Sequence, residues 1–374
     1  MSISVPNRTM KILKLETDLL NVPLPRAVAL PTAQDPRPAT HVEVVIARVL
    51  TDSAHTGLGF AYILGGGGVA VRSILDTVIA ETVVGRDPAL LESLFVQTVT
   101  RLEGSGFAGL AARAYAAFDF ALWDIKGKVA GVPVYQLLGG YRTKLKAIVS
   151  DTATPVLGNK QAIKDTLAAL DAGAAGVQIE VGTDDPELDA ERLRALREGI
   201  PDGAWFEVSA CGRYDFASAA WMGTLGTEEF GLDGFGDPLR PDDLNNLNRL
   251  SNRLDVGLSV GAYFDRPAEF LRVIDQGGIS AVRIDPLRIG GITPARKIAA
   301  AAELRHIAIC PVRLPEIGTH LSAGVALGRM CETVDWFRPL FDGGPQYENG
   351  QLVVASGPGL GIRLNEMNAA KWRV

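Results

Sequence analysis

The sequence predicts an α/β fold, in which a modified (β/α) barrel follows an N-terminal α+β capping domain. Two observations support this prediction. After Gly140, short apolar runs alternate with helix-length segments, as they do in repeated βα units. Before Gly140, a strand-rich segment is followed by two helical segments. A chain of 374 residues that is 47% hydrophobic and 21% charged can bury the large core that such a fold requires.

Residues 1–140 are predicted to form the capping domain. HVEVVIARVLT alternates polar and apolar residues with a period of two, and TGLGFAYI follows after a turn, which predicts a β-meander. Two helical segments come next, VRSILDTVIAETVVG and SGFAGLAARAYAAFDFALWDIKGKVAGVPV. The second is rich in alanine and carries apolar residues at spacings of three and four.

Residues 141–342 are predicted to form the barrel, which is of the TIM type. Eight strands are expected, at LKAIVSD, AGVQIEV, AWFEVSA, FGLDGFGDP, DVGLSVGA, ISAVRIDP, HIAICPV and VDWFRPL. Repeated βα units that lack a nucleotide-binding fingerprint favour a closed barrel over an open doubly wound sheet. Residues 343–374 are too irregular for another unit, and they are predicted to pack back on the cap.

Composition and charge favour small molecules as partners. The formal net charge is −6 and no basic run is present, so binding to nucleic acid or to an anionic membrane surface is not expected. The three cysteines lie far apart and form no C-x-x-C motif, which argues against a disulfide framework or a structural zinc site. MSISVPNRTMKILKL lacks the apolar segment of a secretory signal, and no stretch reaches about 18 apolar residues, so a cytoplasmic protein is expected.

Two segments carry a resemblance to a known family. Residues 112–140 resemble the signature helix of the mandelate racemase and muconate lactonizing branch of the enolase superfamily. IDPLRIGGITPARKIAAAAEL is similar to the sixth strand and helix of that branch. The resemblance covers nearly the whole chain. It implies a capped barrel, a homo-oligomer, and lid loops around residues 31–40 and 65–68 that close over the barrel mouth.

The resemblance also implies a chemistry, but the metal ligands of that chemistry are absent. The family removes the proton α to a carboxylate and holds the enediolate on Mg²⁺ with acidic ligands ending the third, fourth and fifth strands. At the matching positions this chain has Ser209, Gly236 and Ala262. A hard dication requires oxygen ligands, so neither a metal nor another cofactor is predicted. Ser209 stays a candidate substrate contact.

The acid and base groups of the family are altered as well. Gln178 and Glu180 replace the two lysines of the second-strand K-x-K motif, and alternation points both into the barrel. Glu180, near the mouth, is a candidate catalytic residue. Glu207 also faces inward two residues before Ser209, and Tyr263 can donate a hydrogen bond, so both are candidate substrate contacts.

Three further candidates come from the last strands. Asp285 keeps the family identity at the end of the sixth strand and is a candidate general base. Either Val312 or Arg313 stands where the family has its catalytic His. Arg338 stands where a family Glu often helps to bind substrate. Arg313 and Arg338 are predicted to bind a substrate carboxylate, because a guanidinium grips a carboxylate in bidentate fashion.

Three functions are compatible with these residues. The first is a metal-independent isomerase or lyase that acts on a small polar substrate with a carboxylate or carbonyl group, in which arginines bind the anion and Asp285 or Glu180 moves the proton. The second is a catalytically inactive relative that acts as a binding protein. The third is a Mg-dependent dehydratase or racemase whose metal has moved to a cluster of Glu180, Glu207, Asp237 and Asp285.

Overall fold

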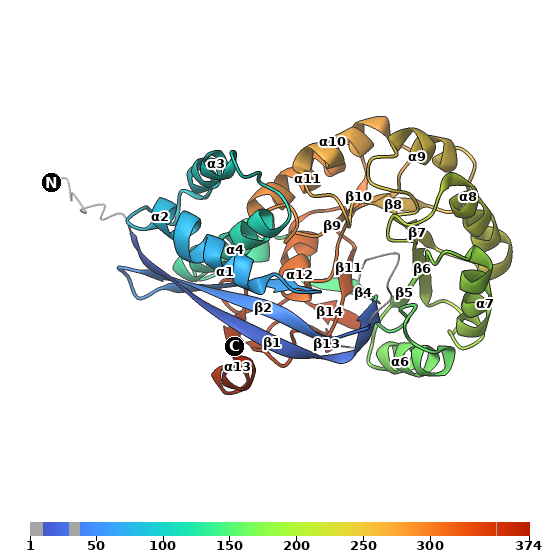
Figure 1. Cartoon of the computed structure of the whole chain (residues 1–374), viewed down its shortest axis with the longest axis horizontal. Coiled ribbons are helices and arrows are strands. Elements are labelled where there is room, and N and C mark those ends of the chain that lie inside the picture. The colour runs from blue at the N-terminus through green and yellow to red at the C-terminus, as the bar shows by residue number, and fades with distance from the viewer. Residues whose placement is uncertain (1–9, 30–37, 349) are drawn as a thin grey trace.

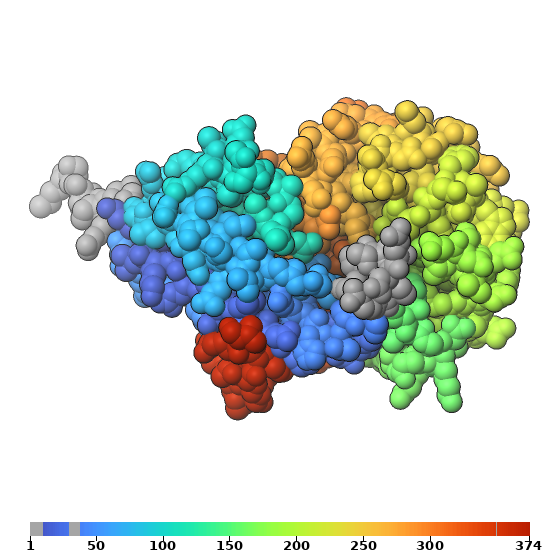
Figure 2. Space-filling view, in the orientation of Figure 1, coloured from blue at the N-terminus to red at the C-terminus, as the bar shows by residue number. Residues whose placement is uncertain are grey.

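The computed structural model describes residues 10–29, 38–348 and 350–374. Within this part, the chain forms an antiparallel sheet with its helices and, beside it, a barrel (Figure 1). Figure 2 shows the cap packed against one side of the barrel. Residues 1–9 and the segment 31–37 of the expected lid lie outside the described residues. In the described part, no helix has both the length and the apolar content needed to cross a membrane.

The cap begins with the predicted meander. Its three strands pair antiparallel in the order β1 (Ile12–Ala29), β2 (Pro38–Thr51) and β3 (Thr56–Ile63). The helical segments that follow are α1 (Gly68–Ile74), the π-helical η1 (Leu75–Ile79), α2 (Ala80–Val83), α3 (Leu91–Leu102), α4 (Leu110–Ala130) and α5 (Val134–Leu137). Residues 44–47 of β2 and residues 57–63 of β3 are buried without alternation, so both faces of the sheet are covered there and the period of two in the sequence does not mark a single buried face.

Helix α4 lies directly on β3, because two glycines of the strand leave room for its backbone. A Cβ atom on Gly59 would lie 1.9 Å from the carbonyl oxygen of Ala117, and one on Gly57 would lie 2.1 Å from that of Ala121. No side chain separates the strand from the helix at these points. The sheet and α4 therefore form one rigid support for the cap residues that reach the barrel mouth.

We expect Gly59→Ala to lower the free energy of unfolding by about 3 kcal/mol, because the added methyl group meets helix backbone that cannot rotate away. Chemical denaturation monitored by circular dichroism measures the change. Gly104→Ala is the matched control, since a Cβ atom there meets no atom within 4 Å. Equal stability of the two variants would contradict the close contact between strand and helix.

The barrel has eight parallel strands, and the fold class predicted from the sequence is confirmed. The strands are β4 (Lys144–Val149), β5 (Gly176–Glu180), β6 (Trp205–Ser209), β7 (Gly234–Gly236), β8 (Leu258–Val260), β9 (Ala281–Ile284), β10 (Ala308–Pro311) and β11 (Met330–Thr333). The helical segments between them are α6 (Asn159–Asp171), α7 (Pro186–Arg197), α8 (Phe216–Leu225), η2 (Gly226–Phe230), α9 (Leu244–Ser251), α10 (Pro267–Gln276), α11 (Ile292–Leu304) and α12 (Pro315–Gly324). β11 pairs with β4, which closes the barrel.

The eighth strand is Met330–Thr333, so its prediction at residues 334–340 is wrong. The apolar residues of the later segment pack against the cap, where the rings of Phe337 and Phe60 lie 5.4 Å apart between centroids. Their pattern therefore reflects a contact with the cap and not a strand. Glu332 interrupts the apolar pattern of the true strand, because it pairs with an arginine inside the barrel.

The C-terminal segment contacts both parts of the molecule. β14 (Gln351–Val353) pairs with β4 and with β13 (Gln346–Glu348), whereas β12 (Phe341–Gly343) pairs with β15 (Ile362–Leu364). The last helix, α13 (Glu366–Trp372), lies beside the cap sheet, and Val374 donates a backbone hydrogen bond to Leu19 of β1. We keep residues 140 and 342 as the proposed domain boundaries.

Buried aspartates of α4 tie the cap to the barrel. Asp119 accepts hydrogen bonds from the Thr293 hydroxyl at 2.5 Å and from the Thr293 amide at 3.0 Å, in the first turn of α11. Burial raises the pKa of Asp119 to about 7, against the lowering effect of the Thr293 hydrogen bonds. Asp124 accepts from the amides of Leu58 and Leu360, which joins β3 to the C-terminal segment. The cap is therefore held in place at the barrel by satisfied buried polar groups.

Candidate active site at the barrel mouth

A cavity of about 260 Å³ lies at the carboxyl ends of the barrel strands, beneath the cap. The strand ends of a (β/α) barrel are where such proteins build their sites. Strand ends and following loops of the barrel contribute Asp151, Gln178, Glu180, Cys211, Tyr263, Arg288, Arg313, Glu332 and Trp336, and the cap contributes Val28, Tyr62, Gly66 and Arg113. The glycine run 65–68 therefore reaches the cavity at Gly66.

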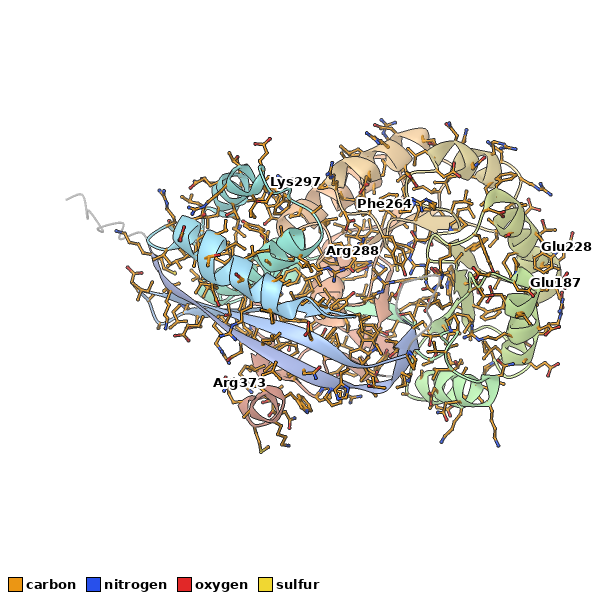
Figure 3. The ribbon with its side chains drawn as sticks, in the orientation of Figure 1. Glu187, Glu228, Phe264, Arg288, Lys297 and Arg373 are labelled. Carbon is orange, nitrogen blue, oxygen red and sulfur yellow. The ribbon has the colours of Figure 1, made fainter. Side chains whose placement is uncertain are left out.

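Three arginines line this cavity. Arg313 follows β10 in a left-handed conformation (φ 64°), and its Nη2 donates a hydrogen bond to the Tyr263 hydroxyl at 2.6 Å. Arg288, labelled in Figure 3, lies between the cap helices and the barrel and donates to the carbonyl of Tyr263 at 3.1 Å. Arg113 comes from α4 and donates to the carbonyl of Tyr62 at 3.0 Å. The cavity thus concentrates guanidinium groups suited to a carboxylate.

Val312 and Arg313, the two residues expected where the family has its catalytic His, differ in their surroundings. Val312 is fully buried, and its amide donates to the carbonyl of Ile284 on β9. Arg313 lines the cavity and lies above the ring of Tyr263, 4.9 Å from its centroid. Of these two residues, Arg313 is therefore the one that faces the cavity.

Glu180 ends β5 and lines the cavity as its spacing predicts. Its Oε1 accepts a hydrogen bond from Arg213 at 2.7 Å, and Arg213 also donates to the carbonyl of Val181 at 2.6 Å. This ion pair fixes the carboxylate at the edge of the cavity. Sequence reasoning missed Arg213, although its place shortly after β6 at the mouth was a usable signal.

Asp285 lies behind the cavity wall and not on its surface. The carboxylate is 1% exposed; its Oδ1 accepts from the Leu287 amide at 3.0 Å and its Oδ2 from the Tyr62 hydroxyl at 3.3 Å. The same Oδ2 lies 3.9 Å from Nη1 of Arg313. Burial, together with the charge of Asp285, raises the pKa of Tyr62 to about 12. These contacts suit a residue that positions Arg313 and Tyr62.

The interior of the barrel, below the cavity, holds a buried cation. Arg283 of β9 is 2% exposed and contacts the carboxylates of Glu207 at 3.3 Å and Asp237 at 3.4 Å. It also donates to Glu332, and to Gln178 Oε1 at 2.9 Å. Burial raises the pKa of Glu207 and of Asp237, although Arg283 opposes the shift in both. Three carboxylates therefore share one guanidinium, which makes the arginine indispensable to the barrel core.

The positions of the expected metal ligands do not fit a divalent cation. A side chain at Gly236 would collide with Arg283, because its Cβ atom would lie 1.9 Å from Nη1 of the guanidinium. Ser209 is buried, its hydroxyl accepts from the Cys211 amide at 3.4 Å, and Ala262 offers no oxygen. Among the described residues, no three His, Cys, Asp or Glu side chains form a group that could hold a metal ion.

The relocated metal cluster considered from the sequence does not assemble. Glu207 and Asp237 contact Arg283, whereas Glu180 pairs with Arg213. Asp285 is bound to the Leu287 amide and the Tyr62 hydroxyl. The four carboxylates therefore have three different sets of partners, and within the described part of the chain they form no group that could hold a metal ion.

The remaining candidates divide between the cavity and other places. Gln178 and Tyr263 line the cavity, but Glu207 lies deeper and accepts from Gln178 at 2.9 Å. Arg338 is exposed and lines a different cavity, because β11 ends at Thr333 and the chain has turned away by residue 338. The prediction that Arg338 lies at the barrel mouth is therefore wrong. Burial raises the pKa of Cys211 to about 11, which keeps the thiol protonated.

We expect Arg283→Met to lower the free energy of unfolding by about 3 to 5 kcal/mol, because three carboxylates lose their only buried cation. Urea denaturation at pH 8 measures the loss. Arg305→Met is the control, since the Arg305–Asp275 pair is more than half exposed and should contribute within about 1 kcal/mol. If both variants were equally stable, the interior network would not support the barrel.

The chain is thus a capped (β/α)-barrel protein whose mouth carries acidic and basic side chains at the strand ends. Two family models match it: "Mandelate racemase / muconate lactonizing enzyme, N-terminal domain" over residues 17–139, and "Enolase C-terminal domain-like" over residues 162–368. The protein belongs to the mandelate racemase and muconate lactonizing branch of the enolase superfamily. The resemblance noted in residues 112–140 is confirmed at the level of the family.

Known relatives include a dehydratase, a cycloisomerase and an epimerase. The L-talarate/galactarate dehydratase of Salmonella typhimurium is 28% identical over 90% of this chain and 84% of its own length. Its structure with Mg and L-lyxarohydroxamate matches with a TM-score of 0.92 at 26% identity, covering 100% of this chain and 95% of that one. The 3,6-anhydro-alpha-L-galactonate cycloisomerase of Streptomyces coelicolor is 28% identical over 83% of this chain and 85% of its own length. An L-Ala-D/L-Glu epimerase of Clostridium acetobutylicum is 26% identical over 92% of this chain and 96% of its own.

Proposed function

We propose that this protein is a metal-independent isomerase or lyase that acts on a small carboxylate, such as a sugar acid or its lactone, in the mouth cavity. The observation that carries the proposal is the position of two groups of arginine side chains, one at the mouth and one inside the barrel. Arg113, Arg288 and Arg313 line the cavity, while Arg283 occupies the interior where a metal ligand would project from Gly236. Guanidinium groups take the place of the dication in binding and stabilising an anion.

In this proposal, Glu180 removes the proton α to the substrate carbonyl. The C–H bond breaks, its electron pair moves into the enolate, and the proton passes to the Glu180 carboxylate, which Arg213 orients. Guanidinium groups stabilise the enolate less than a dication does, so a substrate with a more acidic α-proton, as in a lactone or ketone, suits this site. Return of the proton to the carbon gives isomerisation, and loss of a β-substituent gives elimination.

The residues named from the sequence take different parts in this proposal. Glu180 and Arg313 keep the roles of base and anion binder. Asp285 holds Arg313 and Tyr62, and is therefore a positioning residue. Gln178 and Tyr263 are available to contact substrate at the cavity surface. Ser209 and Glu207 support the barrel interior beneath them.

The experiment follows α-proton exchange by NMR in D₂O with excess EDTA, using galactarate, galactaro-1,4-lactone, 3,6-anhydro-L-galactonate and L-Ala-L-Glu as probes. We expect exchange with at least one of them at pH 7 to 8, and its loss in Glu180→Gln. Exchange that appears only after Mg²⁺ is added would contradict metal independence. Binding without any exchange would instead favour an inactive relative that acts as a binding protein.

Arginine substitutions test the anion site. We expect Arg313→Met to weaken binding of the active probe by about tenfold to a hundredfold, because one charge-assisted hydrogen bond set is lost. Isothermal titration calorimetry measures the dissociation constant. Arg338→Met is the matched control, since Arg338 is exposed outside the mouth cavity. Equal losses in both variants would show that the effect is one of net charge.

A further inference from the structure

Asp151 lies two residues beyond the end of β4 and lines the mouth cavity. Its side chain is 3% exposed, and its Oδ2 accepts hydrogen bonds from the indole of Trp336 at 2.9 Å and from Arg26 at 2.7 Å. Its Oδ1 is buried and has no hydrogen-bond partner among the described residues. A buried carboxyl oxygen without a partner is costly, so its retention at a cavity surface points to contact with a ligand.

Asp151 also borders a second cavity. This cavity, of about 500 Å³, lies between α6 and the segment that follows β11. Asp151 and Val334 are the two residues that line both cavities within the described part of the chain. Asp151 therefore lies between the mouth cavity and the second cavity.

The charges around Asp151 favour a carboxyl group that holds its proton near neutral pH. Burial raises the pKa of Asp151 to about 7, and Asp335 adds to the rise, whereas Arg26 and the Trp336 hydrogen bond lower it. Asp165 of α6 also faces Arg26, at 3.5 Å, and Tyr347 lines the second cavity. Glu180 is also ion-paired, with Arg213, but its side chain is 18% exposed, whereas that of Asp151 is 3% exposed. One cavity thus brings together a partly exposed carboxylate and a buried carboxyl group that can donate a proton.

We propose that Asp151 is the general acid of this site and protonates the leaving hydroxyl of a β-hydroxy carboxylate bound in the mouth cavity. The inference rests on the function proposed above and narrows it to elimination of water. Glu180 takes the α-proton, and the electron pair of that C–H bond forms the C=C bond as the β C–O bond breaks. The departing oxygen takes the proton of Asp151 and leaves as water, so Glu180 ends protonated and Asp151 ends ionised.

The second cavity provides a way to restore the starting state. Ionised Asp151 can regain a proton from water on that side while the product still fills the mouth. The charge of Asp151 acts directly on Arg26 of β1, because Arg26 forms ion pairs with Asp151, Asp165 and Asp335. The Arg26 guanidinium therefore links the position of the cap to the protonation state of Asp151.

The test compares α-proton exchange with water loss in the same NMR samples of galactarate in D₂O. We expect Asp151→Asn to retain exchange and to lose elimination by a hundredfold or more, within the range of about 10² to 10⁴ for a general acid. Elimination by the wild type should fall as the pH rises through about 7, because only protonated Asp151 is competent. Arg26→Gln should move this midpoint to higher pH, since it removes the group that lowers the pKa of Asp151.

Asp275→Asn is the control, because the exposed Asp275 pairs with Arg305 and lines neither cavity. It should leave both rates unchanged. Elimination at the wild-type rate in Asp151→Asn, or a parallel loss of exchange and elimination, overturns the assignment. Absence of exchange in the wild type defeats the proposed function instead.

A carbon-13 NMR titration of the Asp151 carboxyl group decides the assignment without any substrate. A midpoint between about pH 6 and 8 in the wild type, higher in Arg26→Gln, supports the general acid. A carboxyl group that stays ionised from pH 5 to 9 overturns it, whatever the protein turns over.

Discussion

The guanidinium of Arg283 inside the barrel is the interaction on which the rest of the site depends. It contacts Glu207, Asp237 and Glu332, which come from strands on different sides of the barrel. Desolvated charges are tolerated only when they are paired and hydrogen-bonded, so these strands keep their register around the arginine. The same guanidinium occupies the space beside Gly236, and the barrel interior thus carries a fixed monovalent cation at its centre.

The fixed position of Arg283 affects how an anion can be bound at the mouth above it. A dication would bind both substrate and enolate by direct coordination, whereas the Arg283 guanidinium is already paired with Glu207, Asp237 and Glu332. In the proposed function the anion is held higher up, where Arg113, Arg288 and Arg313 line the cavity. Because a guanidinium donates directional hydrogen bonds, the positions of these side chains, which Tyr263 and Asp285 contact, would then take the role that coordination geometry has at a metal.

The cap completes the site and is not a passive cover. Arg113 and Tyr62 reach the cavity from α4 and β3, and Arg26 of β1 binds the Asp151 carboxylate at the mouth. Their positions depend on the close packing of α4 on the glycines of β3 and on the hydrogen bonds of Asp119 to the first turn of α11. The proposed acid-base pair and the proposed anion site therefore lie where the two parts of the chain meet.

The sequence by itself determined the fold and most of its strands, because periodicity and local motifs lie in neighbouring residues. It also placed Glu180 and Arg313 at the mouth. It could not reveal Arg283, which is hidden in the apolar run ISAVRIDP, since its partners lie 46 to 105 residues away. The exclusion of Arg338 and the burial of Asp151 between two cavities were likewise decided by tertiary structure, because both depend on where β11 ends and on how distant segments pack.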